Sequence, residues 1–89
     1  MNKKRRQEID KIIKQLRKGV NLEGVAFDIE MIKDEEEYTF DNYPENLQDS
    51  RRGQSMQDAI DNLDEALLAI EDEEDYQVVI QYLNNARWA

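Results

Sequence analysis

The chain has 89 residues, 37% of them charged, a net charge of −9, and neither cysteine nor histidine. A chain of this length forms one small domain with a thin core, so self-association or a bound partner would add to its stability. Without Cys and His there is no disulfide, thiolate zinc site, thiol nucleophile or imidazole base, so we expect no enzyme, no cofactor and no metal site.

The charges are segregated along the chain. Residues 1–18 hold eight bases and two acids, a balance of +6, whereas the other 71 residues hold four bases and 19 acids, a balance of −15. Segregation of this kind serves the fold where a basic helix lies along an acidic one. It serves binding where one charged face is shown to a partner. The sequence leaves both interpretations open.

Residues 3–38 form the first predicted helical segment. Its first apolar stripe has spacings of three and four and consists of Ile9, Ile12, Ile13, Leu16 and Val20. A second stripe lies on roughly the opposite side and consists of Leu22, Val25, Ile29 and Ile32. We favour one long helix with a local kink at 19–24; a straight helix would need a partner on each side, as in an oligomer. The main alternative is a break, with Gly19 just past a helix C-terminus and Asn21 as the next N-cap.

Residues 39–50 form a predicted joint. Asp41, Asn42 and Pro44 end the first segment, and Asp49 or Ser50 can cap the next one. Pro44 can also start one short helical turn over residues 44–47. We expect the apolar residues Phe40, Tyr43 and Leu47 to fold back over the open end of a helical hairpin; the alternative is an exposed aromatic contact with a partner.

Residues 51–88 form the second predicted helical segment. Its first apolar stripe has heptad spacing and consists of Met56, Ile60, Leu63, Leu67 and Ile70. Five acids follow at 71–75, and then a further stripe of Tyr76, Val79, Leu83 and Ala86. The acids are either a bulge in one helix or a joint, with Asp72 or Asp75 capping a third helix. A terminal strand at 76–80 is a weaker alternative, and Trp88 is expected to anchor the tail by packing.

Two charged clusters are the candidate binding sites. The acidic cluster is expected to contact a partner protein and consists of Glu35, Glu36, Glu37, Asp58, Asp61, Glu65, Glu71, Asp72, Glu73, Glu74 and Asp75. Carboxylates in rows on a rigid helix can imitate the charges of a DNA backbone and occupy a basic groove. The basic cluster is a candidate for nucleic-acid or self-assembly contacts and consists of Lys3, Lys4, Arg5, Arg6, Lys11, Lys14, Arg17 and Lys18.

The joint also carries a resemblance to a known family. Residues 40–53 read FDNYPENLQDSRRG, and this segment resembles one in small acidic proteins encoded by bacteriophages and prophages. In those proteins two glutamate-rich helices flank an F-D-N-x-P-E-x-L-Q-x-S-x-x-G joint. The likeness covers about residues 36–70, excludes the last fourteen residues, and departs at the glycine-containing stretch 19–24. It implies a phage-related origin and a protein that disables host machinery by tight binding; it carries no functional residues over.

We therefore predict a single all-α domain over residues 1–89, built as a self-associating helical hairpin. The predicted core consists of Ile9, Ile13, Leu16, Ile29, Ile32, Met56, Ile60, Leu63, Leu67, Val79 and Leu83. The expected function is non-catalytic inhibition of a host defence or nucleic-acid-handling protein with a basic surface. The alternatives are a self-assembling structural module and a nucleic-acid binder that uses the basic N-terminal helix. No apolar run reaches the ~20 residues of a membrane span, so we expect a location in the bacterial cytoplasm and no membrane partner.

Overall fold

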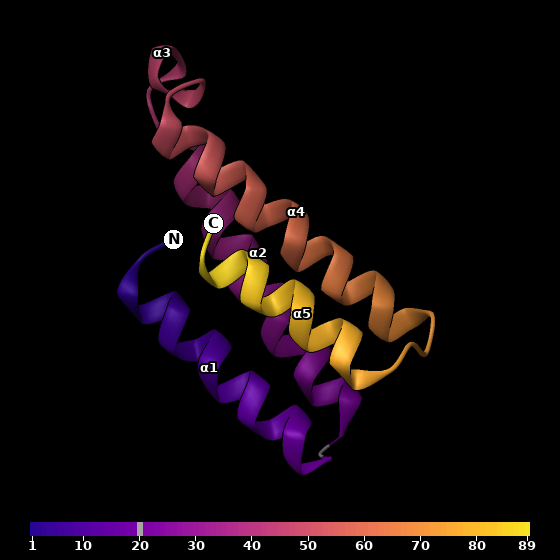
Figure 1. Cartoon of the computed structure of the whole chain (residues 1–89). Helices are drawn as coiled ribbons and strands as arrows, with labels where there is room; N and C mark the ends of the chain where they lie inside the picture. Colours follow the sequence, from indigo (N-terminus) through magenta and orange to yellow (C-terminus); the bar gives the residue numbers. More distant parts are fainter. Residues whose placement is uncertain (20) are drawn as a thin grey trace.

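The computed structural model describes residues 1–19 and 21–89, and the regular structure within them is helical, with no strand. The elements are α1 (Lys3–Lys18), α2 (Leu22–Asp41), α3 (Glu45–Gln48), α4 (Arg51–Glu71) and α5 (Tyr76–Arg87). Four of them run alternately up and down, and each packs against its two neighbours in the closed order α1, α2, α4, α5 (Figure 1). The result is an antiparallel four-helix bundle, which confirms the all-α prediction.

The order of packing places α1 and α4 at diagonally opposite corners of the bundle. The helices α2 and α4, of 20 and 21 residues, extend past α1 and α5 at one end, where α3 closes the tip (Figure 1). The α4–α5 connection lies at the other end (Figure 1). The basic helix therefore packs on α2 and α5, and not along α4.

The first predicted segment contains two helices, so the favoured long kinked helix is wrong and the alternative of a break is confirmed. Gly19 takes the left-handed conformation at φ 77°, which suits glycine and ends α1. The side chain of Asn21 accepts a hydrogen bond from the Glu23 amide at 2.8 Å and caps α2. After this reversal both apolar stripes face one core. Val20, assigned to the first stripe, lies outside the described residues.

The joint is a short helix held between two long ones. The Gln48 side-chain amide donates to the carbonyls of Phe40 and Tyr43, at 3.2 and 3.3 Å, and ties α3 to the end of α2. Ser50 caps α4 by accepting from the Gly53 amide. The side chains of Phe40 and Tyr43 are half-buried, whereas Leu47 is 42% exposed.

The acidic run 71–75 divides the second segment into α4 and α5, which excludes both one continuous helix and a terminal strand. Asp75 is the N-cap of α5 and accepts from the Gln77 amide at 2.8 Å. At the end of α4, the amides of Glu73 and Glu74 donate to the carbonyls of Ile70 and Ala69. This pair of bonds is a Schellman motif, and it places Glu73 in the left-handed conformation at φ 56°.

The core is the line where the four long helices meet. Ten of the eleven predicted core residues are buried, and the remaining one, Leu67, is half-buried against the same cluster. The alanines of α4 were not predicted; Ala59, Ala66 and Ala69 are at most 1% exposed. Small side chains on this face let α4 lie close to its neighbours.

Trp88 was expected to pack into the structure, and that prediction is wrong because its side chain is 75% exposed. The tail is held by polar contacts instead. The Arg87 side chain binds Asp10 of α1 with a shortest contact of 2.7 Å, and Arg6 donates to the Arg87 carbonyl at 3.0 Å. The Trp88 ring stacks against the Arg87 guanidinium, whose carbon lies 4.3 Å from the ring centroid.

Candidate interaction surfaces

The clearest acidic surface lies on the outer face of α4. Asp58, Asp61 and Glu65 are exposed, and their spacings of three and four place them on one side of the helix. At ~1.5 Å of rise per residue the row spans roughly 10 Å. None of the three takes part in an ion pair with the described residues. Their charge is therefore available to a partner; we call this row the α4 acidic row.

The triplet 35–37 does not act as one surface. Glu36 is fully buried, and its carboxylate binds the Arg5 guanidinium at 3.1 Å and the α-amino group of Met1 at 3.4 Å. Its assignment to the partner-binding surface is wrong, because a buried, ion-paired carboxylate cannot reach a partner. Glu35 lies 3.9 Å from Arg5, and Glu37 lies 3.6 Å from Lys33 on the same helix.

The run 71–75 is exposed at the end of the bundle, away from the triplet, and part of it has a local structural role. Asp75 caps α5 and Glu73 closes the Schellman motif, so these two acids shape the turn between the helices. The predicted acidic cluster is thus spread over α4, α2 and one end of the molecule.

The basic cluster forms a strip along the outside of α1. Arg5 and Arg6 do not belong to it, because Arg5 binds Glu36 and Arg6 binds the C-terminal tail. The exposed members, which we call the α1 basic strip, are Lys3, Lys4, Lys11, Lys14, Arg17 and Lys18. None of them forms an ion pair within residues 1–19 and 21–89. The strip runs for roughly 22 Å along the helix.

Lys33 connects two helices that both carry acids. Its ammonium nitrogen lies 2.8 Å from a carboxylate oxygen of Asp64 on α4 and 3.6 Å from Glu37 on α2. The hydrogen bond that Lys33 donates to the Asp64 carboxylate is the main cause that raises the pKa of Lys33 above its ordinary value, and Glu37 adds to it. Desolvation acts in the opposite direction and is outweighed.

Sequence reasoning missed an apolar surface on α2. Phe27, Met31 and Tyr38 are 63%, 48% and 73% exposed, and they lie opposite the buried stripe of the same helix. Their spacings of four and seven were visible in the sequence. That signal is obscured in the sequence because Val25, Ile29 and Ile32 already give this helix a complete apolar face.

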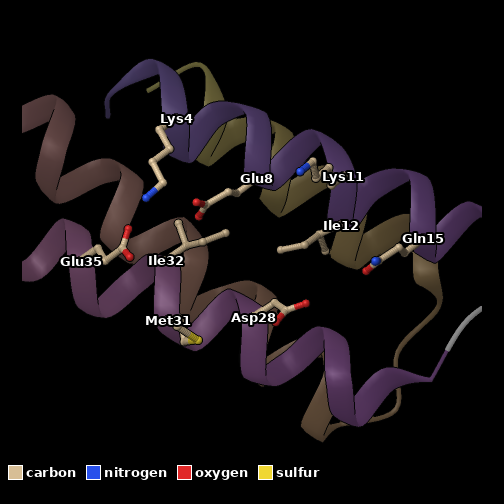
Figure 2. Close-up of a pocket in the computed structure, with 9 residues that line it drawn as sticks. All are labelled: Lys4, Glu8, Lys11, Ile12, Gln15, Asp28, Met31, Ile32 and Glu35. Carbon is tan, nitrogen blue, oxygen red and sulfur yellow. The ribbon is translucent and has the colours of Figure 1, made fainter.

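A groove of about 350 Å³ lies between α1 and α2, beside this apolar line. Figure 2 shows Lys4, Glu8 and Lys11 on the α1 side and Asp28 and Glu35 on the α2 side. Its apolar lining comes from Ile12, Met31 and Ile32. Charges of both signs therefore surround an apolar base, an arrangement suited to holding an amphipathic side chain or segment.

These features define a small helical bundle with a basic edge at α1 and acidic faces on α2 and α4. Within the described residues, no helix is long and apolar enough to cross a membrane, and no group of three potential ligand side chains could hold a metal ion. Comparison with protein-family models, with curated proteins and with solved structures found no match.

Proposed function

We propose that this protein is a non-catalytic binding protein that occupies the basic, phosphate-binding surface of another protein and thereby inhibits it. The observation that carries the proposal is the α4 acidic row, which is exposed, unpaired within the described residues and held on a rigid helix. Spaced carboxylates attract a basic groove in the same way as a nucleic-acid backbone and accelerate association. The phage resemblance of the joint supports a bacterial host protein, of a defence or nucleic-acid-handling kind, as the target.

The test is a comparison of three immobilised proteins exposed to nuclease-treated bacterial lysate. The first is wild type, the second replaces the α4 acidic row (Asp58→Asn, Asp61→Asn, Glu65→Gln), and the third replaces three exposed acids at the tip (Asp41→Asn, Glu45→Gln, Asp49→Asn). The two variants change net charge equally. We expect wild type and the tip variant to retain the same partner, and the α4 variant to retain about tenfold less.

A short DNA duplex should release the partner from wild type if the acidic row imitates a phosphate backbone. Equal retention by the α4 variant would contradict the proposal, as would failure of the duplex to compete. The purified protein itself is expected not to bind the duplex, because acids on α2 and α4 repel phosphate. A shift of the duplex that disappears when the α1 basic strip is neutralised would favour the nucleic-acid binder instead.

Self-association is a second candidate function, and the placement of the charged helices favours it. The α1 basic strip and the α4 acidic row lie at diagonally opposite corners, so they cannot pair within one molecule. They can pair between copies. Such a contact joins two different surfaces, so it is heterologous and produces chains or rings instead of a closed dimer.

A further inference from the structure

The outer face of α2 carries large apolar side chains that the bundle leaves uncovered. Phe27, Met31 and Tyr38 lie on one side of the helix, and each is about half exposed or more. They extend over twelve residues, a rise of roughly 16 Å along the helix. A line of large apolar side chains along one helix, unlike a single exposed one, indicates a contact surface. We call these three residues the α2 apolar line.

Acids border the α2 apolar line on both sides. Helical geometry at ~100° per residue places Glu30 and Asp34 along one edge and Asp28 and Glu35 along the other. Lys33, the only base of α2, lies toward α4 and forms an ion pair with Asp64. Lys4 and Lys11 of α1 lie across the groove from Asp28 and Glu35. An occupant must therefore offer apolar side chains in the middle and positive charges mainly at the edge that faces Glu30 and Asp34.

The groove beside α2 gives the occupant a place to insert. Met31 belongs both to the α2 apolar line and to the lining of the groove, so the two apolar surfaces are continuous. Ile12 and Ile32 extend the lining inward between α1 and α2. A helix lying along α2 can thus place one large apolar side chain in the groove and others over Phe27 and Tyr38.

A second copy of this chain does not fit the same surface. The exposed face of its α1 consists of bases and two glutamines and carries no large apolar side chain. Its other exposed apolar residues are Leu47, Leu68 and Trp88, on separate elements, and Leu68 lies among acids that α2 would repel. Nucleic acid is repelled as well.

We propose that α2 docks a basic amphipathic helix of the partner protein, with the α2 apolar line as anchor and the flanking carboxylates as its charged rim. The inference rests on the proposed function in that the partner is basic. It adds the secondary structure of the partner's contact segment and a second binding surface, distinct from the α4 acidic row.

The probe is a synthetic peptide of lysine and leucine, about 18 residues or roughly five helical turns long, patterned as an amphipathic helix. A scrambled peptide of equal composition is the control ligand. Titration is followed by fluorescence anisotropy of the labelled peptide and by amide chemical shifts of the isotope-labelled protein. We expect the patterned peptide to bind at least about tenfold more tightly than the scrambled one and to shift amides of residues 24–38.

Two variants locate the site. Phe27→Ser with Tyr38→Ser should weaken binding about tenfold or more, whereas Leu68→Ser with Trp88→Ser should change it less than about twofold, because both pairs are exposed and only the first lies on α2. Circular dichroism checks that each variant is folded. Glu30→Gln with Asp34→Asn tests the rim without touching the apolar line, and should also weaken binding.

Equal binding of the scrambled peptide, or shifts centred on α4, would overturn the inference. So would a Phe27→Ser, Tyr38→Ser variant that is folded and binds as wild type does. If such a variant still captures the lysate partner that the α4 acidic-row variant loses, the proposed function stands and the docking surface on α2 is excluded. If the patterned peptide binds α2 but no basic partner depends on the α4 acidic row, the docking surface stands and the proposed inhibitory mode fails.

Discussion

Glu36 is the residue at which charge and burial conflict most strongly. A buried carboxylate is tolerated only when it is paired, since its desolvation is costly and its attraction to a counter-ion must offset that cost. Here Arg5, whose side chain is 11% exposed, donates a hydrogen bond from Nε to the Glu36 carboxylate at 3.2 Å, and its Nη2 lies 3.1 Å from the same oxygen. The pair links the start of α1 to the last turns of α2, so it holds the two helices in register.

Arg5→Met should therefore destabilise the protein by about 3 kcal/mol, because it leaves the Glu36 carboxylate buried with one cation fewer. Lys11→Met, which removes an exposed base from the same helix, should cost less than about 0.5 kcal/mol. Urea unfolding followed by circular dichroism measures both. The double variant Arg5→Met, Glu36→Leu should recover much of the loss; a double variant as unstable as Arg5→Met would show that packing, and not the uncompensated charge, dominates.

Gly53 is required by close packing, not by backbone conformation. A Cβ at this position would lie 2.0 Å from the Gln48 carbonyl oxygen, so the first turn of α4 can meet α3 only without a side chain. Gly53→Ala should cost about 2 kcal/mol or more. Gly24 of α2 is the matched control, because a Cβ there meets nothing within 4 Å.

Gly24→Ala should stabilise the protein by up to about 1 kcal/mol, since alanine favours the helix over glycine. The two substitutions are chemically the same and are expected to have opposite signs in urea unfolding. A stabilising Gly53→Ala would mean that the tip can move away from α4 at little cost.

At the residue scale the sequence predicted apolar burial well and polar burial poorly. Core residues follow from helical spacing, which depends only on local geometry. Glu36 continues the buried positions of α2 at the same spacing, after Val25, Ile29 and Ile32, and that continuity was a usable signal. Recognising it requires knowing that Arg5, 31 positions away, reaches the same point. The prediction for Trp88 was wrong because an aromatic side chain was expected to be buried. The ion pair between Arg87 and Asp10 holds the tail without it.

At the scale of elements, the turn residues could be recognised in the sequence, but the path that the chain takes through them could not be predicted. Gly19 is typical of a helix end and Asn21 of a helix start. These local signals do not decide between one long helix and a reversal of the chain, because that choice depends on tertiary packing. The reversal wins because it buries the stripes of α1 and α2 in one core instead of on two separate sides. In the joint, three of the positions in the F-D-N-x-P-E-x-L-Q-x-S-x-x-G pattern have a structural role: Gln48 donates to carbonyls, Ser50 caps α4 and Gly53 permits close contact with α3.

The α4–α5 connection contains strain that can be removed. Glu73 occupies the left-handed position of a Schellman motif, where glycine is usual and a side chain costs about 1 kcal/mol. Glu73→Gly should therefore raise the free energy of unfolding by up to about 1 kcal/mol. Glu74→Gly, the neighbouring exposed acid without a positive φ, removes the same charge and should bring no such gain. Thermal unfolding distinguishes them, and equal effects would attribute any gain to charge.

The ion pair between Lys33 of α2 and Asp64 of α4 should stabilise the protein less at alkaline pH. Its pKa is raised in the folded state, so its contribution to stability is complete below the unfolded value of about 10.4 and is lost as pH rises through the folded value. Wild type and Lys33→Met should therefore differ by a constant free energy of unfolding up to about pH 10. The difference should shrink above that pH. A difference that stays constant to about pH 11.5 would show that the ion pair with Asp64 contributes nothing.

At the scale of the whole molecule, the bundle separates its charges instead of neutralising them. The sequence allowed a basic helix lying along an acidic one. Among the described residues, the ion pairs between residues 1–18 and α2 are those of Arg5 with Glu35 and Glu36 and of the Met1 α-amino group with Glu36. The diagonal arrangement of α1 and α4 could not be read from the sequence, because it depends on which helices are neighbours. It leaves the α1 basic strip and the α4 acidic row facing in opposite directions.

Heterologous pairing of these two surfaces makes a prediction that a symmetric dimer does not. Wild type should form salt-sensitive assemblies at low ionic strength that dissociate at about 0.5 M salt, where screening acts within about 4 Å. A variant with a neutralised strip (Lys11→Gln, Lys14→Gln, Lys18→Gln) and one with a neutralised row (Asp58→Asn, Asp61→Asn, Glu65→Gln) should each be monomeric alone. Mixed together, they retain one intact surface each and should form a one-to-one dimer that grows no further.

Sedimentation velocity measures all four samples: wild type, each variant alone and the mixture. A mixture that stays monomeric while wild type assembles would exclude this contact, and monomeric wild type at low salt would leave the charged surfaces to other partners.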